Sequence, residues 1–236
     1  MSVETHRVLI GACGWKHSAW LTDFYEEDLP VEWQLGFYSN EFPVVYVPAS
    51  DWFDVLNSDD SDAIDMAEWA EDVSGFFRFI LEIPPQGLND EQLFTATLNK
   101  AKALGESCLG LVLQLNPTII DDALLFKKYL DQAKAIAPVC IDKAGNSLTT
   151  EIENILVKEN ISEVWHGGQQ GNENLKRGSL AISLVSTDEL DMVGLRKVVE
   201  VALSASTENC ISALCFYGNP PSLEKLRNAE IILNLL

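Results

Sequence analysis

Apolar segments of four to seven residues alternate along this chain with longer amphipathic stretches. The apolar segments predict strands at residues 8–12, 44–47, 77–83, 109–115, 138–142, 162–166, 180–185 and 211–217. A helical pattern of apolar positions follows each of these strands except the sixth. Strands that alternate with helices in this way are typical of a parallel α/β protein.

Eight such units without a linker between them predict one domain, residues 1–236, folded as a single TIM-like (β/α)8 barrel. The length of 236 residues is close to the roughly 250 typical of that fold, and a closed barrel leaves no sheet edge exposed. Turn-forming residues dominate 167–174, after the sixth strand. We therefore expect the helix between strands six and seven to be reduced to a loop.

Several polar residues stand where helices are expected to begin. Ser61 and Asn89 precede the second and third long helical patterns, and Ser222 precedes the last one. Ser186 and Glu189 have the spacing of a capping box, in which the serine accepts from the helix backbone. We expect these residues to cap the helices that follow them.

The first strand ends in glycines and runs directly into an aromatic loop. Gly11, Gly14, Trp15, Trp20, Phe24 and Tyr25 stand out in this opening, and Tyr217, Asn219, Asn228 and Ala229 stand out near the other end. In these positions the chain resembles the YecE-like family, also called domain of unknown function 72. Cys13 stands where the family has serine, and Glu26 stands where it has proline. The resemblance implies a TIM-type barrel and no established reaction.

In barrels of this kind the site is built at the C-terminal ends of the strands. The resemblance implies a glutamate and an asparagine on strand two, where this chain has Tyr46 and Pro48. It implies a lysine on strand three, where this chain has Glu82. Gln114 on strand four is kept, whereas Ser183 on strand seven replaces an expected polar residue. Several polar positions of the family are therefore lost.

Three titratable residues remain as candidates for catalysis: Glu82, Asp142 and His166, which end strands three, five and six. His166 titrates near neutral pH and is the best acid or base among them. His166 with Gly167 resembles a family His-Gly pair, although strand count places it on strand six rather than seven. The alternative is a hydrogen-bonded structural histidine beside Trp165.

The same three residues offer carboxylate and imidazole groups that suit a divalent metal. Their scattered positions lack the local spacing of a metal motif, so we expect no metal. No glycine-rich nucleotide loop is present, and we expect no cofactor.

Four further residues are candidates for ligand binding at the barrel mouth: Trp15, Tyr46, Gln114 and Asn219. The aromatic residues of the first loop either stack on a ligand or pin the loop by packing. A carboxylate at position 82 in place of a lysine favours neutral or cationic ligands over anions.

The chain carries a formal net charge of −20, with 16 acidic and two basic residues in the first 75. This sign opposes binding to nucleic acid and to anionic membranes; a basic protein partner is the alternative to a simple solubilising surface. Five cysteines without a C-x-x-C pair favour a reducing compartment. No leader or membrane-spanning run is apparent, and we expect a cytoplasmic protein.

Two functions follow from these observations. The first is an uncharacterised barrel that binds a small polar molecule at its C-terminal mouth. The alternative is a diverged, non-catalytic barrel that serves as a binding or scaffold protein.

Overall fold

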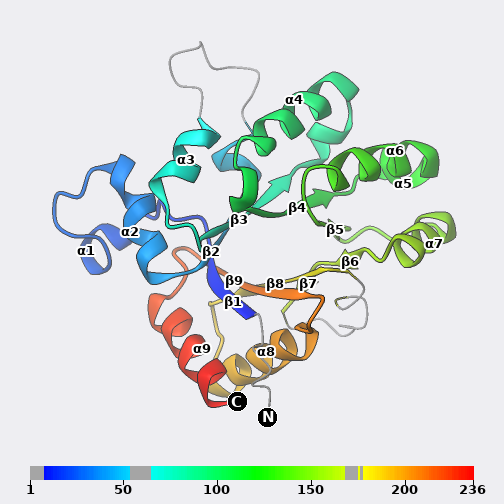
Figure 1. Cartoon of the computed structure of the whole chain (residues 1–236). Coiled ribbons are helices and arrows are strands. Elements are labelled where there is room, and N and C mark those ends of the chain that lie inside the picture. The colour runs from blue at the N-terminus through cyan, green and yellow to red at the C-terminus, as the bar shows by residue number, and fades with distance from the viewer. Residues whose placement is uncertain (1–7, 54–64, 168–174, 176–177) are drawn as a thin grey trace.

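The computed structural model describes residues 8–53, 65–167, 175 and 178–236, in which parallel strands form a nearly closed barrel surrounded by helices (Figure 1). The strands are β1 (Val8–Cys13), β2 (Val44–Val47), β3 (Arg78–Ile83), β4 (Cys108–Gln114), β5 (Val139–Asp142), β6 (Ser162–Glu163), β7 (Trp165–His166), β8 (Leu180–Ser186) and β9 (Ile211–Tyr217). The α-helices are α1 (Trp20–Asp23), α2 (Gln34–Glu41), α3 (Met66–Asp72), α4 (Glu91–Lys102), α5 (Pro117–Asp121), α6 (Ala123–Lys134), α7 (Thr150–Glu159), α8 (Met192–Ala205) and α9 (Leu223–Leu235). The parallel barrel expected from the alternating pattern is confirmed.

The sheet runs in the order β6-β5-β4-β3-β2-β1-β9-β8-β7. Its two ends, β6 and β7, are adjacent in sequence and separated by Val164 alone. The backbone N–H of Val164 donates to Ile141 O of β5 at 2.8 Å, whereas that of Gly167 donates to Leu184 O of β8 at 2.8 Å. The expectation of one continuous sixth strand at 162–166 is therefore wrong: this segment changes its hydrogen-bonding neighbour halfway and forms two short strands.

The expectation of a loop in place of a helix after the sixth strand falls mainly on residues 168–174 and 176–177, which lie outside the described part of the chain.

Side chains alternate between the two faces of each barrel strand. One set forms an apolar cluster inside the barrel, which includes Val44, Ile80, Val112, Cys140, Leu184, Ala213 and Cys215. The other set packs with the surrounding helices in a second, larger cluster. The apolar interior fills the barrel below its C-terminal end, so polar chemistry is confined to that end.

The helix caps were predicted with mixed success. Ser222 caps α9, because its hydroxyl accepts from Lys225 N at 3.4 Å. Asp90 rather than Asn89 caps α4, accepting from Leu93 N at 2.8 Å. The two adjacent residues have similar capping ability, and sequence alone could not choose between them.

The capping box expected at positions 186 and 189 is absent from α8. That helix begins later, and Asp191 caps it by accepting from Gly194 N at 2.7 Å. Glu189 instead adopts a left-handed backbone conformation, with φ of 56°. The predicted cap Ser61 lies outside the described residues, and Asp65 caps α3 through Ala67 N at 2.8 Å.

Candidate functional site

The barrel mouth is lined by one inward-facing residue at the end of each barrel strand other than β6. Each of these residues follows, at a spacing of two, a residue that faces the barrel interior, because strand side chains alternate. We call this set the mouth ring: Cys13, Tyr46, Glu82, Gln114, Asp142, His166, Ser186 and Tyr217. All three catalytic candidates and two of the ligand-binding candidates lie in it.

Glu82 is the centre of a hydrogen-bond network that joins three strands. Its Oε1 accepts from the Tyr46 hydroxyl at 2.9 Å and from Gln114 Nε2 at 2.5 Å. Its Oε2 accepts from Ala49 N at 2.8 Å. Lys143, a conceivable partner, forms an ion pair with Glu163 at 3.5 Å instead. The carboxylate at position 82 therefore receives three donors from β2, from the turn after β2 and from β4.

Asp142 and His166 form the second polar group of the ring. His166 Nε2 lies 3.2 Å from Asp142 Oδ1, and Ala144 N donates to the same carboxylate at 2.8 Å. Asp142 is buried, whereas 32% of the His166 side chain is exposed. The imidazole therefore stands between a buried carboxylate and solvent at the mouth.

In this pair the pKa of His166 is raised and the pKa of Asp142 is lowered. The hydrogen bond to Asp142 raises the pKa of His166; burial opposes this, and the charges of Asp142 and Glu82 add to it. Burial alone would raise the pKa of Asp142, but the hydrogen bonds from His166 and Ala144 outweigh it and the pKa is lowered. Each group therefore favours the charged form of the other.

Cys13 of the mouth ring is a protonated thiol. Burial raises its pKa well above the ordinary value, and Cys215 and the carboxylates of Glu82 and Asp51 raise it further. A reactive thiolate needs the opposite environment, with basic neighbours. Cys13 therefore acts as a small packing side chain and not as a nucleophile.

Trp15 lies away from the mouth ring, although sequence analysis placed it among the ligand-binding residues. Its side chain is 2% exposed and packs edge-on against Trp69, with ring centroids 4.8 Å apart. Trp20, also 2% exposed, donates from Nε1 to Pro221 O at 3.1 Å. These two aromatic residues of the first loop therefore pin the loop to the barrel.

Asn219 lies beside the ring, in a cavity of about 460 Å³ formed by residues that follow β1, β2 and β9. We call this cavity the first-loop pocket. It also contains Lys16, His17 and Asp51, none of which was singled out as a site residue. The signal for Asp51 was weak, because it follows β2 by four residues in a turn whose shape the sequence does not reveal.

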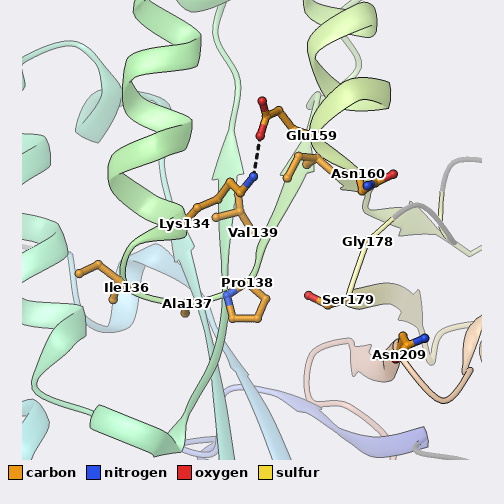
Figure 2. Close-up of a pocket in the computed structure, with 11 residues that line it drawn as sticks. Lys134, Ile136, Ala137, Pro138, Val139, Glu159, Asn160, Gly178, Ser179 and Asn209 are labelled. Atoms are coloured by element: carbon orange, nitrogen blue, oxygen red, sulfur yellow. Dashed lines mark hydrogen bonds and ion pairs between the residues drawn. The ribbon is translucent and has the colours of Figure 1, made fainter.

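A larger cavity, of about 800 Å³, lies at the opposite end of the barrel (Figure 2). It is lined by residues that precede β5, β6, β8 and β9, among them Pro138, Ser179 and Asn209. Lys134 and Glu159 form an ion pair of 2.7 Å at its edge. In parallel barrels this end serves stability rather than catalysis, so the mouth ring and the first-loop pocket remain the candidate site.

The described residues contain no group of three or more histidine, cysteine, aspartate or glutamate side chains placed to hold a metal ion. Within the same residues, no helix combines the length and apolar character needed to cross a membrane.

Comparison with known proteins gives a family and a fold. The family model described as Protein of unknown function DUF72 matches residues 9–170. Two DUF72 family proteins of solved structure resemble this chain at 13% identity each. The one from Enterococcus faecalis V583 has a TM-score of 0.67 and matches 97% of this chain and 96% of its own. The one from Thermotoga maritima MSB8 has a TM-score of 0.66 and matches 98% and 99%.

A sugar phosphate isomerase/epimerase from Parabacteroides distasonis ATCC 8503 resembles the chain in fold as well. It has a TM-score of 0.56 at 13% identity and matches 99% of this chain and 94% of its own. Among curated proteins, none matches the sequence.

Proposed function

Because the chain belongs to the DUF72 family, whose description assigns no reaction, we propose its function from its own residues: it binds a small polar molecule, neutral or cationic, at the C-terminal mouth of the barrel. The observation that carries this proposal is the ion pair of His166 and Asp142, 3.2 Å apart and partly open to solvent. Titratable groups whose pKa values are shifted by burial and by a specific charged partner are a feature of functional sites.

His166 has one ring nitrogen to offer such a ligand. Nε2 faces Asp142, and Nδ1 has no hydrogen-bond partner among the described residues. When the ring is protonated, Nδ1 can donate to an oxygen of a bound molecule and exchange a proton with it. The charges of two carboxylates, Asp142 and Glu82, act on this ring and disfavour a ligand that is itself an anion.

The fold likeness to an enzyme named as a sugar phosphate isomerase/epimerase is consistent with small-molecule chemistry at a barrel mouth. At 13% identity it supports the location of the site and not the substrate.

A second candidate, a non-catalytic barrel that binds a protein partner, is favoured by one observation. The carboxylate of Glu82 is already engaged by three donors of the chain itself, which is how a structural residue behaves. The net charge of −20 would select a basic partner.

A ligand panel separates these two candidates. Amines, amino acids, neutral sugars and sugar phosphates are added to the full chain, and the melting temperature is recorded. We expect at least one neutral or cationic compound to stabilise the wild type and to lose most of that effect in His166→Gln. The matched control is Lys102→Gln, an exposed change in the last turn of α4, before β4, which should leave the effect intact. Stabilisation by none of the compounds would contradict the proposal and favour the protein-binding barrel.

A further inference from the structure

Gly14 lines the first-loop pocket and contributes no side chain to it. This residue has a left-handed backbone, with φ of 74°. A Cβ at this position would stand 3.3 Å from Asp51 Oδ2 and 3.6 Å from His17 Nε2. The glycine therefore leaves a gap between a carboxylate and an imidazole, at the bottom of a cavity of about 460 Å³.

His17 presents a hydrogen-bond acceptor in this pocket. Nε2 lies 3.0 Å from Cys13 O, and a carbonyl only accepts, so Nε2 carries the proton. Burial lowers the pKa of His17, which keeps the ring neutral near pH 7 and leaves a lone pair on Nδ1. The ring is held edge-on against Trp20, with centroids 4.3 Å apart. The backbone of Gly14 is a second hydrogen-bond partner of the ring.

The rest of the pocket adds an aromatic surface and donors. Tyr217 faces the mouth from the end of β9 and remains 42% exposed, unlike the buried aromatic residues of the first loop. Lys16 and Asn219 bring N–H donors to the same cavity. The positive charge of Lys16 balances the negative charge of Asp51, so the pocket has no net charge.

We propose that the first-loop pocket is a binding subsite for an unphosphorylated sugar or cyclic polyol of monosaccharide size. This inference rests on the proposed function and names its ligand class. A hydroxyl group both donates and accepts, so it can use the acceptors Asp51 and His17 together with the donors Lys16 and Asn219. The C–H face of a sugar ring can lie against an exposed aromatic side chain such as Tyr217.

A phosphorylated ligand fits this pocket poorly. Lys16 is the one cation among its lining residues, and its ammonium group lies 5.4 Å from the centre of the Trp15 ring. A dianionic phosphate would face Asp51 in the pocket and Glu82 nearby without an arginine to receive it.

The test is equilibrium binding to the full chain, measured by calorimetry with neutral pentoses and hexoses, the corresponding sugar phosphates, and simple amines. We expect at least one neutral sugar to bind, and its phosphate to bind about tenfold more weakly or not at all. Asp51→Asn and Tyr217→Ala should each weaken the binding of the neutral sugar by about tenfold, since each removes a direct contact. Matched controls are Asp23→Asn and Trp33→Ala, at exposed positions away from the pocket.

The outcomes separate this inference from the proposed function. Sugar binding that is lost in His166→Gln but unchanged in Asp51→Asn and Tyr217→Ala overturns the subsite and leaves the mouth as the site. Binding of amines or of sugar phosphates in preference to neutral sugars overturns the ligand class alone. Binding by no compound of the panel overturns both.

Discussion

His166 Nε2 lies 3.2 Å from Asp142 Oδ1, and this contact joins β7 to β5 across the break in the sixth strand of the barrel. On one side of the break β6 pairs with β5, and on the other side β7 pairs with β8. An ion pair therefore links two strands that are not connected by the backbone ladder at this level. The pair is at once a candidate site and part of the closure of the barrel.

Replacement of His166 by glutamine should change how stability depends on pH. The pKa of His166 is raised in the folded protein, so its stabilising contribution is full below the unfolded pKa of about 6.5 and is lost as pH rises through the folded value. The difference in unfolding free energy between wild type and His166→Gln should be greatest near pH 5 to 6, at about 1 kcal/mol or less because the imidazole is partly exposed. It should shrink at higher pH, once the pH has passed the folded pKa of His166.

Urea unfolding across this pH range gives the measurement, and His17→Gln serves as the control. The pKa of His17 is lowered, so protonation of that ring at acid pH costs stability. The difference in unfolding free energy between wild type and His17→Gln should therefore change with pH in the opposite direction to that of His166→Gln. A difference for His166→Gln that does not vary with pH would show that the ion pair does not stabilise the fold.

Substitutions of Glu82 should lower the free energy of unfolding even when no ligand is present. Glu82→Gln keeps the shape but weakens hydrogen bonds to a charged acceptor, with an expected loss of roughly 1–3 kcal/mol. Glu82→Lys replaces the acceptor by a donor and leaves the Tyr46 hydroxyl, the Gln114 amide and Ala49 N to find other partners, so its loss should be larger. Chemical denaturation compares the three proteins. Equal stability of Glu82→Lys and wild type would refute the network.

Replacement by phenylalanine should lower the free energy of unfolding by different amounts at the two buried tryptophans of the first loop. Trp20 Nε1 donates to Pro221 O, whereas Trp15 Nε1 is buried without a hydrogen-bond partner in the described structure. Both changes leave a cavity, but Trp20→Phe also breaks a hydrogen bond and should cost roughly 1 kcal/mol more. Thermal and urea unfolding of the pair measure this difference. A larger loss of unfolding free energy in Trp15→Phe than in Trp20→Phe would contradict this prediction.

Gly11 should not tolerate a side chain. A Cβ there would lie 1.9 Å from Val44 O, a backbone atom of the neighbouring strand that cannot move without separating β1 from β2. Gly11→Ala should cost more than the roughly 1–3 kcal/mol typical of overpacking, or prevent folding. Gly75→Ala, with no atom within 4 Å of the added carbon, is the control. Circular dichroism and yield of soluble protein report the outcome, and a normally folded Gly11→Ala would count against this packing.

The fold could be predicted because each strand is short, apolar and bounded by turn residues. The break at Val164 could not, since residues 162–166 form a run that reads as one strand and only the backbone hydrogen bonds reveal the change of neighbour. The cap of α8 was misplaced because Ser186 belongs to β8, which extends one residue past the apolar run used to bound it.

The site was predictable to the extent that it follows from strand ends. Asp142 and His166 lie together because parallel strands finish at one end of the barrel. The engagement of Glu82 depends on Ala49 N, which is presented by a turn whose geometry no residue pattern encodes. The sequence left two roles open for Trp15, because an aromatic residue after a glycine turn can face either the mouth or the surrounding helices; only the structure reveals its packing on Trp69.

The bond from Trp20 to Pro221 has a consequence for synthesis of the chain, because its two ends are 201 residues apart. The first-loop pocket draws on residues from the same two regions, near positions 14–17 and 217–219. During translation the N-terminal half emerges first, at about 5–20 residues per second, and waits without the strand and loop that complete its cavity. The candidate binding surface therefore forms only after residues 217–219 have been made and have docked, so a nascent chain that lacks them has no pocket for a ligand.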